Sequence, residues 1–166
     1  MLDMYPGGEL AEATFKTDPF AEAGFVDREP FLPNAIGRGP YSNMPTWTSA
    51  LRHRLIPGSR PDLFVAQKIA LVRYMPWMHL SAGMHHVSGA TLATRELVFA
   101  HFKYNADFHR KVTEEVSRAQ HFNGAEEYRK YLQVLSEGRD VIYEERLSVP
   151  WTEAPFIKAL LGWEAG

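Results

Sequence analysis

The sequence predicts an α+β fold with an irregular N-terminal segment, a small three-stranded antiparallel sheet and two to three C-terminal helices. Three apolar, β-branched stretches lie between residues 64 and 104, whereas from residue 105 onward apolar residues recur at helical spacing. Strands that cluster in one part of a chain, with helices following in another, are typical of α+β proteins.

The composition is that of a soluble protein with one domain. The chain has 166 residues, of which 45% are hydrophobic and 23% are charged, and its formal net charge is −2. This near-neutral charge argues against a general nucleic-acid binder, which needs clustered surplus Lys and Arg. The absence of cysteine rules out disulfides and thiolate metal sites. No apolar run reaches the roughly 18 residues that span a bilayer. We therefore expect no transmembrane segment and, because no signal peptide is evident, a cytoplasmic location.

Residues 1–60 are expected to form an irregular segment that belongs to the same domain as residues 61–166. Eight of the 11 prolines lie in the first 61 residues, which is too many for long helices or a continuous sheet. The segment is nevertheless rich in aromatic residues, unlike a disordered tail. Either these side chains wrap the rest of the domain, or their natural packing partner is missing. They are Phe15, Phe20, Phe25, Phe31, Tyr41 and Trp47.

Three segments after Pro61 are expected to be strands. Residues 64–74 (FVAQKIALVRY) are rich in β-branched and apolar side chains. Residues 78–87 form a plausible second strand, which Gly83 interrupts, and residues 96–104 (ELVFAHFKY) form the third. Together they account for the predicted sheet.

Helices are expected beyond these strands. The first follows a cap at Asn105, and the second follows Asn123, with Glu126 placed to complete a capping box. Gly138 is a natural end for the second helix, and a third helix fits residues 152–161. The apolar stripe of the first helix is Phe108, Val112, Val116 and Ala119, and that of the second is Tyr128, Tyr131, Leu132 and Leu135.

Four histidines lie close together in the sequence, on or beside two predicted strands. They are His79, His85, His86 and His101. Neutral imidazole is the commonest side-chain metal ligand, so two or three of these residues could hold a divalent ion. The alternative is that seven histidines occur in the chain and neighbouring ones meet by chance.

Cationic side chains accompany these histidines. His101 and Lys103 alternate on one face of the third predicted strand, where an imidazole and an ammonium suit a diphosphate or a carboxylate. The alternative is a solvated pair at a sheet edge. Lys68 and Arg73 frame the apolar run of the first strand and would point to opposite faces.

Neither the paired carboxylates nor a search for known sequence motifs indicates a catalytic site. Glu114-Glu115 and Glu126-Glu127 precede Arg118 and Lys130 at the spacing of surface ion pairs, so we interpret both as solvated faces. The chain contains no glycine-rich phosphate loop, no GxSxG, no HExxH and no Asp-x-Asp.

Several segments taken together carry a family resemblance. They are residues 68–74 (KIALVRY), 81–87 (SAGMHHV), 101–104 (HFKY) with Asp107-Phe108, 114–122 (EEVSRAQHF), 127–129 (EYR) and Tyr131-Leu132. In this order and spacing, the chain from Pro61 onward resembles the C-terminal half of bacterial family 2-like glycosyltransferases with the GT-A fold. Residues 2–6 (LDMYP) are similar to the segment that leaves the catalytic core of those enzymes.

The resemblance implies transfer of a sugar from a nucleotide-sugar donor to the hydroxyl of a glycan acceptor. In such enzymes an Asp-x-Asp motif of the N-terminal half holds a divalent metal, Mn or Mg, against the donor diphosphate. The C-terminal half shapes the acceptor site and often adds a histidine to the metal. By position, His85 or His86 is that histidine.

The same resemblance implies the substrate contacts. His101 and Lys103 would face the diphosphate or the acceptor, with Lys68 and Arg73 in support. No Asp or Glu of this chain can be assigned as the catalytic base.

The chain departs from the family pattern because the nucleotide-binding half and its Asp-x-Asp are absent from it. We therefore expect a shortened transferase that is inactive alone and needs the other half in trans or in a longer product. An apolar surface left uncovered would favour self-association. The alternatives are a non-catalytic module that binds a glycan or a protein and a small His-metal enzyme, which the lack of accompanying carboxylates disfavours.

Overall fold

The fold combines short helices with short strands. The computed structural model describes residues 1–34, 36, 46–81, 83–91, 93 and 97–162. These residues contain five α-helices and eight β-strands, and none of these helices is long and apolar enough to cross a membrane. The predicted α+β class is confirmed at this level.

Strands and helices are mixed along the chain rather than separated into two blocks. The strands are β1 (Leu2–Asp3), β2 (Phe25–Asp27), β3 (Phe31–Asn34), β4 (Thr46–Ser49), β5 (His79–Ser81), β6 (His86–Ser88), β7 (Ala100–His101) and β8 (Ser148–Pro150). The α-helices are α1 (Pro19–Glu22), α2 (Ala50–Leu55), α3 (Phe108–Arg118), α4 (Phe122–Ser136) and α5 (Pro155–Leu161). Short 3-10 helices lie at Leu10–Glu12, Pro61–Leu63 and Trp151–Glu153.

Strand pairing in the described residues is limited to four separate two-stranded sheets. β1 pairs with β7 in parallel, whereas β2–β8, β3–β4 and β5–β6 are antiparallel pairs. The prediction of one three-stranded sheet is therefore wrong.

Each of the three predicted strands is shorter than expected, for a local reason. Within residues 64–74, Val65 bridges Thr48, and most side chains beyond it face solvent. Residues 78–87 divide into the β5–β6 hairpin because Gly83 and Met84 take positive φ angles of 63° and 68°. The third segment contributes only the two residues of β7, and its first residue, Glu96, lies outside the described part.

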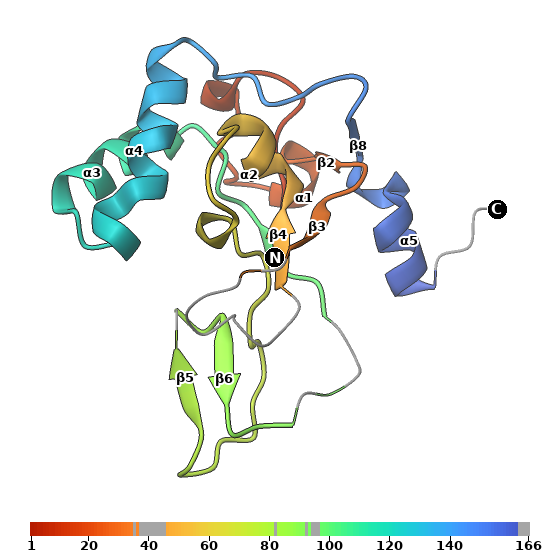
Figure 1. Ribbon diagram of the computed structural model, residues 1–166. Helices are drawn as coiled ribbons and strands as arrows, with labels where there is room; N and C mark the ends of the chain where they lie inside the picture. Colours follow the sequence, from red (N-terminus) through yellow and green to blue (C-terminus); the bar gives the residue numbers. More distant parts are fainter. Residues whose placement is uncertain (35, 37–45, 82, 92, 94–96, 163–166) are drawn as a thin grey trace.

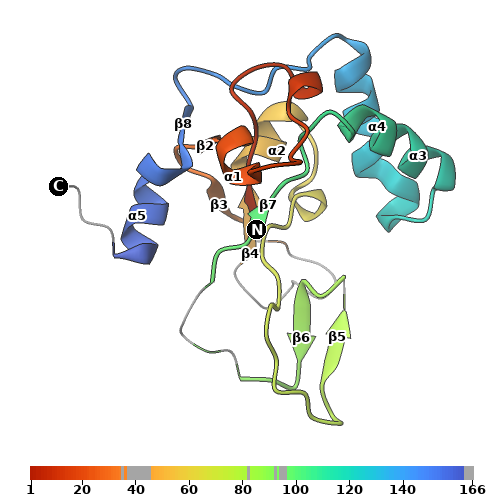
Figure 2. The same cartoon turned by 180° about the vertical axis from the view of Figure 1, so that it is seen from behind.

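The first 60 residues are woven into the fold by long-range pairing. β1 lies beside β7 and β2 beside β8, so the beginning of the chain meets its middle and its end (Figures 1 and 2). Four of the aromatic residues of this segment stack on aromatic rings further along the chain. These pairs are Phe15–Phe102, Phe20–Trp151, Phe25–Tyr143 and Phe31–Phe156. Tyr41 lies outside the described residues, and Trp47 is exposed.

The three predicted helices are present, with different starts. α3 begins at Phe108 and α5 begins at Pro155, each later than predicted. In α4 the residues from Asn123 to Ala125 have left-handed backbone angles, and the Asn123 side chain donates to the Glu126 carboxylate instead of accepting from the backbone. The predicted capping box is therefore wrong, whereas α5 ends at Leu161 as predicted, capped by Gly162 with a φ of 67°.

The α3–α4 hairpin and α2 enclose the largest of three buried hydrophobic clusters in the described residues. The predicted stripe of α4 packs there, with Tyr131 buried and Tyr128, Leu132 and Leu135 partly buried against it. On α3, Phe108 and Val112 are buried, but Ala119 is exposed because it has left the helix. The second core joins the N-terminal strands to α5, and it is formed by Leu2, Met4, Ala23, Val26, Val149, Ala154 and Ile157.

One hairpin extends away from this body. Residues 68–81 and 83–91, which we call the arm, include β5 and β6 and lie on the side of the molecule opposite α3, α4 and α5 in both views (Figures 1 and 2). Large apolar side chains of the arm are exposed, and Leu71 is 88% exposed. The others are Tyr74, Trp77, Leu80 and Met84.

The difference between core and arm predicts two unequal leucine truncations. Leu51 is 2% exposed in the core, so Leu51→Ala is expected to lower the free energy of unfolding by about 2–5 kcal/mol. The matched change Leu71→Ala on the arm is expected to stay within about 0.5 kcal/mol. Urea unfolding followed by circular dichroism measures both. Equal losses would contradict the exposed position of the arm.

Candidate functional site

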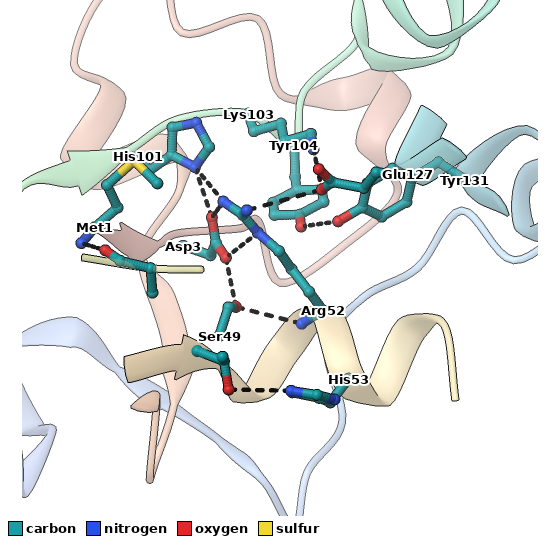
Figure 3. A network of polar contacts seen from close by, with 12 residues as sticks. Met1, Asp3, Ser49, Arg52, His53, His101, Lys103, Tyr104, Glu127 and Tyr131 are labelled. Atoms are coloured by element: carbon teal, nitrogen blue, oxygen red, sulfur yellow. Dashed lines mark hydrogen bonds and ion pairs between the residues drawn. The ribbon is translucent and has the colours of Figure 1, made fainter. Parts of the chain in front are cut away.

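A buried carboxylate lies at the centre of a polar network. Asp3 ends β1, and its side chain is 2% exposed. Arg52 of α2 grips it with two parallel hydrogen bonds, from Nε to Oδ2 at 2.8 Å and from Nη2 to Oδ1 at 2.9 Å (Figure 3). Ser49 Oγ donates to Oδ2 at 2.5 Å. Such a bidentate pair is the strongest neutralising arrangement that an Arg and a carboxylate form.

His101 joins this carboxylate at the surface of the network. The parallel pairing of β1 and β7 places Asp3 and His101 in register, and Nδ1 lies 2.6 Å from Oδ1. The His101 side chain is 34% exposed, in contrast to Asp3. An ionised carboxylate can only accept, so His101 Nδ1 carries a proton and donates to Asp3. Figure 3 shows the second ring nitrogen on the side turned away from Asp3.

Lys103 and Glu127 form the inner end of the network. Lys103 Nζ donates to Glu127 Oε1 at 2.9 Å, and Arg52 Nη1 lies 3.8 Å from the same oxygen. The Lys103 ammonium is also 4.2 Å from the centre of the Tyr131 ring and 4.9 Å from that of Tyr128. Its side chain is only 6% exposed, so it neutralises Glu127 inside the protein and offers no open surface to a ligand.

Burial and pairing oppose each other in the pKa values of these groups. Burial alone would raise the pKa of Asp3, but the charge of Arg52 and the hydrogen bonds from His101 and Arg52 outweigh it and hold that pKa well below its usual range. Burial also opposes ionisation of Glu127, whose pKa is lowered by the charges of Lys103 and Arg52. Both carboxylates are therefore ionised at neutral pH.

His85 interacts electrostatically with Lys68 and with Arg52. His85 Nδ1 donates to the carbonyl oxygen of Gln67 at 2.5 Å. Burial lowers the pKa of His85; that hydrogen bond opposes the shift, and the charges of Lys68 and Arg52 add to it. Of the predicted site residues, His101 is bonded to this network, whereas Lys68 and Arg52 act on His85 only through their charges.

The other predicted site residues, His86 and Arg73, lie on the arm. His86 opens β6 and is half-buried, and Arg73 is exposed. Within the part of the chain that the structure describes, no three His, Asp or Glu side chains are close enough to hold a metal ion. The residues present therefore do not make a complete site for Mn or Mg, and a metal held by His85 or His86 would need ligands from outside them.

Sequence reasoning missed Asp3, Arg52 and Glu127. The interpretation of Glu127 as a solvated surface residue is wrong, although Glu114 does pair with Arg118 on the surface at 3.7 Å. A signal was present, because Glu127 precedes the buried Tyr131 by four positions and so shares its helix face. Asp3 lies within the LDMYP segment but carried no spacing that marked it.

Comparisons with known proteins found no match to this chain among protein-family models, curated proteins or solved structures.

The buried pair predicts a large cost for neutralising Asp3. Asp3→Asn leaves the Arg52 guanidinium buried beside a neutral side chain, so we expect a loss of about 3–5 kcal/mol in unfolding free energy. The matched control is Asp107→Asn, which breaks an exposed pair with Arg110 and is expected to cost at most about 1 kcal/mol. Chemical denaturation measures both, and similar losses would contradict the assigned burial.

Acidification is expected to weaken the fold through the same carboxylates. Because the pKa values of Asp3 and Glu127 are lowered on folding, their contribution is complete above about pH 5 and is lost as the pH falls further. Glu127→Gln should flatten this acid branch, whereas Glu137→Gln, at an exposed pair with Arg139, should not. Denaturant midpoints measured across acid pH test this, and an unchanged slope in Glu127→Gln would contradict it.

Proposed function

We propose that this chain supplies the acceptor side of a family 2-like glycosyltransferase, which transfers a sugar from a nucleotide-sugar donor to an acceptor hydroxyl. One observation carries the proposal. Asp3, His101 with Lys103, and Glu127 come from three separate segments of the family resemblance, and they meet in one buried network. His101 and Asp3 are 98 positions apart in the chain, so their contact depends on the fold and not on sequence proximity.

The charges of this network suit a site that faces an anionic donor. Arg52 and Lys103 are neutralised by Asp3 and Glu127, so they hold the site together and do not bind ligand directly. His101 is partly exposed at its edge, and Lys68 is exposed on the arm; a hydrogen-bonding nitrogen and a positive charge favour a diphosphate or an acceptor hydroxyl.

The donor-binding half and its metal are part of the proposal but not of this chain. Mn or Mg would be held by an Asp-x-Asp from that half, with His85 or His86 as an added ligand. That half would come from a longer product or from a second chain in trans, and we place the assembly in the cytoplasm. Because the described residues form no complete metal site, we derive no step through the metal.

A second candidate is a non-catalytic module that binds a glycan or a protein. The arm favours it, because Tyr74 and Trp77 are 61% and 60% exposed there. Exposed aromatic rings offer a flat apolar face with a polar edge, and such rings are common at binding surfaces. In this alternative the buried network has only a structural role, and the arm carries the function. Self-association of the chain through the arm is a further consequence of its apolar surface.

Calorimetric titration of the 166-residue chain separates these candidates. The acceptor-side proposal predicts saturable binding of inorganic diphosphate that Lys68→Ala weakens by about tenfold, the order that one lost charged contact gives. The matched control Lys111→Ala, at an exposed position of α3, should leave it unchanged. Absence of diphosphate binding by the folded chain would contradict the proposal.

The same titrations with UDP-sugars, with and without manganese, test the need for the donor half. We expect manganese to leave the binding by this chain alone unchanged, and saturable binding that depends on manganese would contradict that requirement. Titration with glycans tests the module: binding that Trp77→Ala abolishes and His101→Gln leaves intact would favour the second candidate.

A further inference from the structure

We propose that His101 is the proton acceptor of this site, with Asp3 as its positioning residue. This inference rests on the proposed sugar transfer and names the residue that the sequence left unassigned, the base that takes the proton of the acceptor hydroxyl. It follows from the geometry of the Asp3–His101 pair and from the exposure of its members.

The carboxylate is held so firmly that it dictates the state of the imidazole. Ser49 and Arg52 Nε occupy Oδ2, and Arg52 Nη2 occupies one side of Oδ1. The remaining acceptor direction of Oδ1 is used by His101 Nδ1 at 2.6 Å. The strand register of β1 and β7 fixes the two backbones from which these side chains extend.

A competing arrangement has Nδ1 bare, accepting from Arg52 Nη2 at 3.2 Å. In that tautomer a lone pair of Nδ1 would face a carboxylate oxygen at 2.6 Å, and two acceptors at this separation repel. The shorter, charge-assisted contact to Asp3 therefore decides the tautomer. In the neutral imidazole, Nδ1 carries the proton and Nε2 is a bare nitrogen.

His101 is the member of the network that can meet a substrate. Asp3 is 2% exposed, and Lys103 and Arg52 are each 6% exposed, whereas His101 is 34% exposed. A proton acceptor must come within hydrogen-bond reach of the hydroxyl it serves, which a sealed carboxylate cannot do. Glu127 is already bonded to Lys103.

The step balances without any group beyond the donor and the acceptor. The acceptor oxygen forms a bond to the anomeric carbon of the nucleotide-sugar while its proton passes to His101 Nε2. The bond between that carbon and the diphosphate oxygen breaks, and its electron pair leaves with the nucleoside diphosphate. The imidazolium that forms is stabilised by the ionised Asp3, the role of the carboxylate in catalytic triads.

Two measurements on the unmodified chain test the assignment directly. Long-range ¹H–¹⁵N NMR should show His101 protonated at Nδ1 with Nε2 bare, and the opposite tautomer would overturn the proposal. Diethyl pyrocarbonate acylates bare imidazole nitrogens, and mass spectrometry gives the rate for each histidine. We expect His101 to react about tenfold faster than the exposed His109, the order that a charge-assisted hydrogen bond contributes. A rate equal to or below that of His109 would also overturn it.

Variants separate positioning from general stability. Asp3→Asn should lower the His101 rate to that of His109 or below, and an unchanged rate in the folded variant would refute the role of Asp3. The matched control is Asp27→Asn, which disrupts a second buried pair, with Arg54, and should leave the His101 rate unchanged. If Asp3→Asn does not fold, the tautomer and rate of the unmodified chain still decide the proposal.

Failure of this inference differs from failure of the proposed function. If His101 reacts slowly with diethyl pyrocarbonate but the chain binds diphosphate, sugar transfer stays in place and another base is required. If His101 reacts rapidly with diethyl pyrocarbonate but the folded chain binds no diphosphate, sugar transfer is contradicted while the reactive imidazole is established.

Discussion

The ion pair between Asp3 and Arg52 is the interaction on which the rest of the structure depends. A buried charge is tolerated only when partners surround it, because its removal from water costs several kcal/mol. For Asp3 those partners come from α2 and β7, and Arg52 in turn reaches Glu127 on α4. Four elements distant in the sequence must therefore be in place together. Apolar contacts alone would not specify this arrangement, since they have no preferred direction.

The short helix α2 forms a second buried ion pair of the same kind. Arg54, two positions after Arg52, donates to Asp27 Oδ1 at 2.8 Å and to the carbonyl oxygen of Ile142 at 2.9 Å. Tyr5 completes this second network, donating to Asp27 at 2.7 Å. Residues two positions apart in an α-helix lie about 200° apart around its axis, so one turn of α2 holds both β1 and β2. The two arginines explain why a chain with such short sheets still has a fixed arrangement.

The sequence predicted local features of this fold better than distant ones. The helices α3, α4 and α5 were predictable because their apolar spacing is contained within each segment. The β1–β7 sheet was not predictable, since β7 has only two residues and its partner β1 lies far from it in the sequence. The alternation of apolar and polar residues within a strand does not identify the strand with which it pairs.

The site residues divide in the same way. His101, Lys68 and His85 were predicted from residue type, because imidazole and ammonium groups are few and chemically distinctive. Asp3 and Glu127 were missed, because carboxylates are common and their burial depends on contacts that cross the fold. Lys103 was found, but its position among aromatic rings could not be read from the strand alternation that suggested an exposed face.

The balance of charge within the network explains why His101 is suited to change its own. Asp3 and Glu127 carry two negative charges, and Arg52 and Lys103 carry two positive ones, so the buried groups are neutral as a set without His101. A proton gained or lost at His101 therefore leaves each buried charge with its partner. Because replacing such buried ion pairs by apolar residues is often neutral or stabilising, stability alone does not account for this arrangement. Under the proposed role of His101, the arrangement has a further reason, since a fixed tautomer at a partly exposed position needs a carboxylate that cannot move.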